Sequence, residues 1–249
     1  MALYKYIKTY PKQSRRRGPK GRLVSGVLIL AGFGLLIWAL GPILTFQILS
    51  EELFSGTVSP LSRQDRAPNA SRVLAAAEGP DDSFQNYLNP NVWFPSAPQL
   101  KVAQNVKEYT LSIPKLKIVD ARVIIGGDSL EKGLIHYGGT AMPGTSGNSV
   151  VFGHSTLPQL YDPRNYRTIF SLLPSLKPAG KGYDGDLIYV TFDGLTYKYV
   201  ITEMTVTRPS DISPLEQTYD NSYLTLITCV PPGTYWERLN VKAKLVPIL

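Results

Sequence analysis

The chain is poor in the residues that most often bind metals or form cross-links. Its 249 residues include one cysteine and two histidines. A single cysteine cannot form an intrachain disulfide, and these three side chains make a poor set of zinc ligands. A lone cysteine is more often an inert core residue, and an unpaired thiol on an exported protein is a liability unless it is buried or used. The surroundings of Cys229 therefore decide what it does.

Acidic residues are absent from the first 22 positions. This segment carries eight lysines and arginines, which leaves 18 of the 26 basic residues beside all 19 acidic residues in the remainder. The net charge of +7 therefore belongs to the N-terminal tail, and the rest of the chain is close to neutral. A nucleic-acid-binding role loses its main support, and we expect no nucleic-acid partner.

Charged residues are also missing from Leu23–Leu49, a run of 27 residues. As a helix of about 1.5 Å per residue it would reach roughly 40 Å, enough to cross a hydrocarbon core of about 30 Å. We predict a transmembrane helix over 23–49 in the plasma membrane, with the basic tail 1–22 in the cytoplasm and the rest outside. A cleaved signal peptide is the alternative, although its apolar region would be unusually long and no small-x-small site directly follows Leu49.

Residues 50–105 show little sustained hydrophobic period. Prolines recur among alanine, serine, aspartate and asparagine, which predicts an extracytoplasmic stalk or linker that lifts a domain off the membrane. Within it, Ser71–Glu78 could form a short helix. The apolar patch Asn91–Pro95 stands out in this polar company, and we expect it to pack on the surface of the domain that follows.

From residue 106 onward the pattern changes to short apolar runs separated by glycine and proline. Asp193-Gly194 lies between Leu187–Phe192 and Leu195–Val206, which is a hairpin signal. Strands dominate, and neither a long amphipathic helix nor an internal repeat is present. The even spacing predicts a mainly β domain over 106–249, a closed β-barrel of about eight strands with short helices.

The cysteine comes at the very end of a predicted strand. Tyr223–Val230 is rich in β-branched and aromatic residues, and a Pro-Pro-Gly sequence ends it. Alternation places Thr225, Ile227 and Cys229 on one face. A second strand begins at Arg238, so a hairpin could bring a guanidinium back beside the thiol.

These residues resemble a known family. The sequence TLITC, followed by PPG, a short loop and RLNVKA, resembles the TLxTC…R signature of sortases, the membrane-anchored cysteine transpeptidases of bacterial surfaces. Upstream, HYGGTAMPGTSGNSVVFGHS from His136 to Ser155 resembles the sortase segment that ends in the catalytic histidine. The motifs occur in the right order, and the resemblance covers roughly Val106–Leu249. The usual HYPGTA is HYGGTA here, which should loosen one turn but removes no chemical group.

A cysteine acyl-transfer site needs a nucleophile, a proton carrier and a donor for the oxyanion. The resemblance implies that Cys229, His154 and Arg238 fill these roles in a sortase-type barrel. On spacing alone either histidine could be the proton carrier; the resemblance favours His154 and gives His136 a supporting place at the substrate site. It also implies that Thr228 lines the site and contacts substrate. A surface cation is the alternative for Arg238, and a strand former for Thr228.

The activity that the resemblance implies is cleavage of an LPxTG-like C-terminal sorting signal, followed by transfer of the thioacyl intermediate to an amine. The partners would be proteins that bear such signals, together with an amine acceptor on a cell-wall precursor or a pilin. Three alternatives stay open: a cysteine peptidase that only hydrolyses, a pilin-polymerising sortase, and a non-catalytic tethered barrel in which Cys229 is a buried filler.

Subclass and metal content follow less directly from the sequence. One N-terminal membrane helix without a hydrophobic tail after Leu245 resembles the housekeeping or class D and E types. Some sortases that build pili have an aspartate-proline-aromatic lid over the active site, to which Asn89-Pro90 with Trp93 is a loose match. The acidic residues of the loop 209–221 are spread out, so we expect no metal, and no cofactor is implied.

Overall fold

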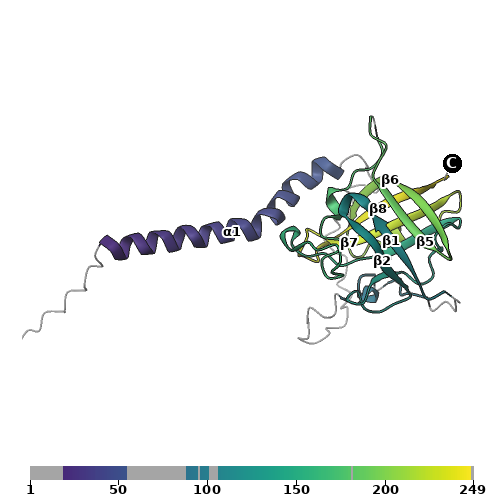
Figure 1. Cartoon of the computed structure of the whole chain (residues 1–249), viewed down its shortest axis with the longest axis horizontal. Helices are drawn as coiled ribbons and strands as arrows, with labels where there is room; N and C mark the ends of the chain where they lie inside the picture. The colour runs from purple at the N-terminus through teal and green to yellow at the C-terminus, as the bar shows by residue number, and fades with distance from the viewer. Residues whose placement is uncertain (1–18, 55–87, 95, 101–105, 181, 248–249) are drawn as a thin grey trace, which may run out of the picture. The chain divides into compact units, whose positions relative to one another are not determined.

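The computed structural model describes residues 19–54, 88–94, 96–100, 106–180 and 182–247 (Figure 1). Two compact units divide after Gly41. Helix α1 runs from Pro19 to Phe54, and its Leu23–Phe46 stretch, with a mean hydropathy of 2.4, is long and apolar enough to cross a membrane. The basic tail up to residue 18, residues 55–87 of the predicted stalk and the predicted Ser71–Glu78 helix lie outside the described residues.

The predicted closed barrel is confirmed, with eight strands in the part of the chain that the structure describes (Figure 1). Around the barrel the order is β1-β2-β3-β4-β7-β8-β6-β5, and β5 closes the ring by pairing with β1. The β2–β3 and β4–β7 pairs are parallel, and the other pairs are antiparallel. The strands are β1 Glu108–Ile113, β2 Ile118–Ile125, β3 Leu134–His136, β4 Gly147–Phe152, β5 Leu187–Phe192, β6 Leu195–Thr207, β7 Ser222–Val230 and β8 Glu237–Val246.

Short 3-10 helices occur before the first strand and in several connections between strands, at positions where the sequence has proline. Each one has proline at one of its first two positions, where the missing N–H costs no internal hydrogen bond. They are η2 Pro90–Val92, η3 Pro114–Leu116, η4 Pro158–Leu160, η5 Leu173–Ser175 and η6 Ser213–Leu215.

Both predicted hairpins form. Strands β5 and β6 are joined by Asp193-Gly194, whose φ angles of 50° and 74° suit a two-residue turn with positive φ at both central positions. Strands β7 and β8 pair antiparallel, and Cys229 lies directly opposite Arg238. The predicted neighbourhood of thiol and guanidinium is therefore confirmed.

The two faces of β7 serve two different apolar clusters. Leu224 and Leu226 belong to the main core, which draws on all eight strands and fills the barrel. Ile227 and Cys229 alternate onto the opposite face and pack in a second cluster. This second cluster also contains Trp93 and Phe94 from the segment before the barrel. The cysteine thus lies on the outer face of the barrel wall and beneath another segment of the chain.

Candidate active site

The parallel pairing of β4 with β7 brings His154 beside Cys229. Phe152 is the register partner of Ile227, and the Gly153 N–H donates to the Ile227 carbonyl at 3.1 Å. His154 follows Phe152 by two residues, and Cys229 follows Ile227 by two residues, so the two occupy equivalent positions along neighbouring segments. The glycine is required locally, because a Cβ at position 153 would lie 2.2 Å from the ring of Phe170.

Arg238 completes the group from β8. The side chain is only 2% exposed, and its Nη1 donates to the carbonyls of Tyr235, at 3.1 Å, and Glu237, at 3.3 Å. Its buried Nε finds no hydrogen-bond partner among the described residues. A buried guanidinium with an unused N–H can donate to a substrate carbonyl or to the oxyanion derived from it.

Burial keeps the thiol and the imidazole uncharged in this structure. It raises the pKa of Cys229 to about 11, although the nearby Arg238 cation acts in the opposite direction. Burial also lowers the pKa of His154 to about 4, with a further lowering from Arg167 and a partial offset from Glu131. At neutral pH the site therefore holds a thiol and a neutral imidazole rather than an ion pair.

The site is covered by residues 88–94, which we call the cover segment. Trp93 and Phe94 are completely buried, and both rings pack against Phe152 of β4, with Trp93 edge-on at 5.3 Å between ring centroids. The Arg238 Cζ lies 5.0 Å from the centroid of the Trp93 ring, in a cation–π contact. The segment packs on the barrel as expected, and it does so directly over Cys229 and Arg238.

The cover segment is tied down beyond its C-terminal end by Gln99. The Gln99 amide donates to the Gly127 carbonyl at 3.0 Å and to Asn91 Oδ1 at 3.1 Å, and its Oε1 accepts from the Gly138 N–H at 2.9 Å. The Leu100 N–H donates to the Gly138 carbonyl at 2.9 Å, and a Cβ at position 138 would lie 2.4 Å from the Leu100 carbonyl oxygen. The glycine that replaces the expected proline therefore supplies both a donor and the space for this docking.

His136 and Thr228 are not brought to the Cys229 side of the wall. His136 is buried, with Nδ1 2.9 Å from the Tyr109 hydroxyl and Nε2 3.2 Å from Thr140 Oγ1, and burial lowers its pKa to about 4. The Thr228 hydroxyl donates to the Gly153 carbonyl at 2.8 Å. A supporting role at the substrate site stays a prediction for both residues.

Sequence reasoning missed two residues that contact this group. The buried Ser155 hydroxyl donates to the Cys229 carbonyl at 2.7 Å, and the Tyr235 ring stacks on His154 with centroids 6.4 Å apart and an interplanar angle of 18°. Their sequence neighbourhoods, directly after His154 and three residues before Arg238, were the only available signal. Among the described residues, no group of three or more histidine, cysteine, aspartate or glutamate side chains is placed to hold a metal ion.

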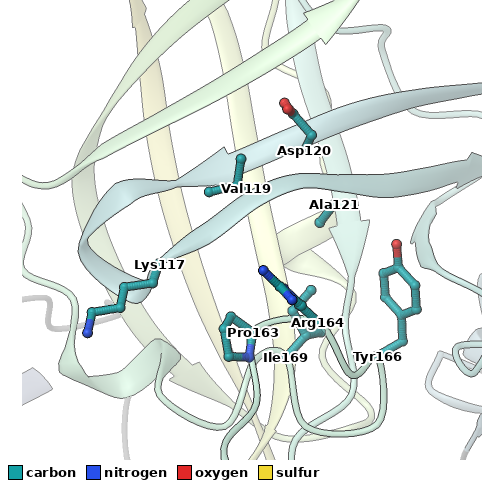
Figure 2. Close-up of a pocket in the computed structure, with 8 residues that line it drawn as sticks. All are labelled: Lys117, Val119, Asp120, Ala121, Pro163, Arg164, Tyr166 and Ile169. Atoms are coloured by element: carbon teal, nitrogen blue, oxygen red, sulfur yellow. The ribbon is translucent and has the colours of Figure 1, made fainter.

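Two cavities elsewhere on the barrel do not include the three candidate catalytic residues. One of about 550 Å³ lies beside the Gln99 docking site and has His136 in its lining. The other, of about 230 Å³, lies between the start of β2 and the loop before η5, and Figure 2 shows the Arg164 guanidinium and the Tyr166 ring in it. Because the cover segment fills the space over Cys229, the site itself is closed to solvent.

The fold and the site together define a class: a β-barrel protein in which a histidine, a cysteine and an arginine lie at adjacent positions of neighbouring strands, just after β4, near the end of β7 and near the start of β8. The Sortase domain family model matches residues 111–246, more than half of the chain. The chain belongs to the sortase family, and this membership places it among the cysteine transpeptidases.

Several solved structures are similar to the chain, whereas no curated protein matches it. A sortase D5 transpeptidase from Clostridium perfringens is 28% identical over 59% of this chain and 83% of its own, with a TM-score of 0.47. A lid mutant of sortase A from Corynebacterium diphtheriae is 32% identical over 59% and 74%, with a TM-score of 0.48. Sortase C-1 from Actinomyces oris is 31% identical over 58% and 77%, with a TM-score of 0.49.

Proposed function

We propose that this sortase cleaves an LPxTG-like C-terminal sorting signal and transfers the acyl group to an amine. The observation that carries the proposal is the convergence of Cys229, His154 and Arg238 from β7, the end of β4 and β8. The basic tail before α1 favours a cytoplasmic N-terminus, which would place the barrel outside the plasma membrane. The partners are then proteins that bear the signal and an amine acceptor on a cell-wall precursor or a pilin.

In the acylation half-reaction, the Cys229 thiolate attacks the threonine carbonyl carbon of the signal. The Arg238 guanidinium donates to the oxyanion of the tetrahedral intermediate. The carbon–nitrogen bond to glycine then breaks, and the His154 imidazolium gives its proton to the departing amine. The product is a thioester on Cys229, and His154 is left as the neutral base.

In the second half-reaction the acceptor amine attacks the thioester carbonyl and loses a proton to His154. Collapse of the second tetrahedral intermediate expels the Cys229 thiolate and forms the new amide bond. The thiolate and the imidazolium are thereby restored. Because the closed form keeps the thiol and the imidazole neutral, the cover segment must move before the ion pair can form.

A pilin-polymerising role is the second candidate. The observation that favours it is Trp93, which follows Asn89-Pro90 and lies over Arg238 in a cation–π contact; the sequence around it is a loose match to the aspartate-proline-aromatic lid of pilin-building sortases. The acceptor would then be a lysine side chain of a pilin subunit, instead of the amine of a cell-wall precursor.

The full chain in detergent micelles, mixed with a panel of LPxTG-like peptides, tests the acylation half-reaction. We expect intact mass to show an acyl adduct on the wild-type protein and none on Cys229→Ala. Addition of an amine acceptor should convert the adduct into a transpeptidation product, whereas a pure peptidase would give hydrolysed peptide with or without the amine. If no adduct forms with any peptide while Cys229 still alkylates, the proposal is wrong for these signals.

A further inference from the structure

His154 lies beyond the end of its strand. Strand β4 stops at Phe152, and the Gly153 N–H makes the last backbone hydrogen bond to β7. A residue that moves protons must be positioned relative to its partner to within a fraction of an ångström. At position 154 the backbone hydrogen bonds of the sheet no longer provide that positioning. The Phe170 N–H donates to the His154 carbonyl at 3.1 Å, but this bond ties the loop to the segment before η5 and not to β7.

Two buried hydroxyls link the residues on either side of His154 to β7. The Thr228 hydroxyl, on β7, donates to the Gly153 carbonyl at 2.8 Å. The Ser155 hydroxyl, on the loop after β4, donates to the Cys229 carbonyl at 2.7 Å. The first bond runs from β7 to the residue before His154, and the second runs from the residue after His154 back to β7. Both side chains are at most 2% exposed, so neither hydroxyl is there to meet water.

We infer that Ser155 and Thr228 are positioning residues that hold the His154 backbone against the end of β7 and so set the imidazole relative to the Cys229 thiol. The inference deepens the proposed function, because it takes Cys229 and His154 as the reacting pair. Ser155 is the main residue to substitute in the test, because its hydroxyl bonds the backbone carbonyl of Cys229 itself. We call the two bonds the hydroxyl staple.

The chain supplies a matched control for Ser155. Ser149, on β4, is equally buried and also donates its hydroxyl to a backbone carbonyl, that of Ala141, at 2.6 Å. Replacement of either serine by alanine removes one hydrogen bond from a buried hydroxyl to a backbone carbonyl. A general loss of stability should therefore appear in both variants, and a loss of site geometry only in Ser155→Ala.

The first readout needs no peptide substrate. The rate of Cys229 alkylation by iodoacetamide is followed against pH in the full chain in micelles, with His154→Ala as the profile of a thiol without its imidazole. We expect the Ser155→Ala profile to move from that of the wild type toward that of His154→Ala, and Ser149→Ala to keep the wild-type profile. The other charges near the pair, Arg238, Arg167 and Glu131, are the same in every variant.

The second readout is acylation by the sorting peptide. We expect kcat to fall on the order of 10- to 100-fold in Ser155→Ala with little change in KM, because the geometry of the pair and not peptide binding is disturbed. Ser155→Thr keeps a hydroxyl at the same place and should restore part of the rate. If the wild-type chain is not acylated at all, the proposed function fails, and the alkylation profiles still decide the staple.

Two results would overturn the inference: Ser155→Ala and Ser149→Ala profiles that coincide, or wild-type and His154→Ala profiles that coincide. If Ser155→Ala shows no cooperative thermal transition, Thr228→Val takes its place in the alkylation assay. That variant keeps the side-chain shape and removes the other bond of the staple. Because iodoacetamide carries no peptide, any contact of Thr228 with substrate does not enter this measurement.

Discussion

Arg238 shows how much of the site depends on one side chain with a fixed shape. Its Nη1 donates to the Tyr235 carbonyl in the loop before β8 and to the Glu237 carbonyl at the start of that strand, and its Nε is left buried for a further acceptor. Lysine has the charge but not the planar fork, so it cannot bind the loop and a substrate oxygen together. The guanidinium is therefore required for its geometry as well as for its charge.

We predict that Arg238→Lys slows acylation on the order of 100-fold, the usual cost of losing one oxyanion donor. Single-turnover formation of the acyl adduct, followed by intact mass, is the measurement. Arg122→Lys is the control, because Arg122 is exposed and its ion pair with Glu108 lies on the surface. Equal rates for Arg238→Lys and the wild type would remove Arg238 from the chemistry.

At the scale of elements, the cover segment contributes to the burial that keeps the Cys229 thiol protonated. The thiol pKa of about 11 arises first from burial, and Trp93 is part of the cluster that excludes water from Cys229. Opening should bring the pKa back toward the ordinary value of 9.0. Opening of the cover segment should therefore expose the Cys229 thiol and lower its pKa at the same time.

We predict that Trp93→Ala speeds alkylation of Cys229 by at least ~10-fold at pH 8, because a thiol with a lower pKa is more ionised at that pH. The rate of iodoacetamide labelling in the full chain measures the effect. Trp236→Ala is the matched control, since that tryptophan is exposed and lies in the loop between β7 and β8. An unchanged rate in Trp93→Ala would mean that Trp93 does not limit access.

The Gln99 docking site should control the same opening from a distance. Gln99 bridges the cover segment at Asn91 with Gly127 and Gly138 of the barrel. We predict that Gln99→Ala raises the labelling rate of Cys229 on the order of 10-fold, because the three hydrogen bonds of the Gln99 side chain that favour the closed form are lost. Gln159→Ala, at an exposed position in η4, should leave the rate unchanged. Slower labelling in Gln99→Ala would contradict this role for the docking site.

For the molecule as a whole, local pattern was sufficient to predict the barrel and the meeting of Cys229 with Arg238. Strand alternation, the Asp193-Gly194 turn and the β7–β8 hairpin involve residues close in sequence. The pairing of His154 with Cys229 depends on a parallel contact between segments about 75 residues apart, for which only the family motif gave a signal.

The contacts of the cover segment had no such signal. Asn91–Pro95 reads as an apolar patch in a polar stretch, and nothing local says that its tryptophan lies over Arg238. The role of Gly138 depends on Gln99, 39 positions earlier, and that of Ser155 on a backbone carbonyl 74 positions later. Long-range polar contacts of single side chains leave no periodicity in a sequence.

Both histidines are buried in neutral form, and this makes the stability of the folded chain sensitive to mild acid. The pKa values of His136 and His154 are lowered from 6.5 to about 4. Below pH 6.5 the two imidazoles bind protons in the unfolded chain but not in the folded chain. The free energy of unfolding therefore falls as pH drops from about 6.5 to about 4. Each histidine should account for about 3 kcal/mol across that window. The carboxyl groups of Asp186 and Asp220, whose pKa values are lowered, titrate only below it.

We predict that the thermal unfolding midpoint of the full chain in micelles decreases steadily from pH 7 to pH 4. His136→Gln is the informative variant, because His136 lies apart from Cys229 and its side chain bonds only neutral groups, Tyr109 and Thr140. It should be less stable than the wild type at pH 7 and should lose about half of the pH dependence. A midpoint that stays constant between pH 6.5 and pH 4.5 would show that the imidazoles titrate freely in the folded chain, and the closed site would then be open to water far more often than its burial implies.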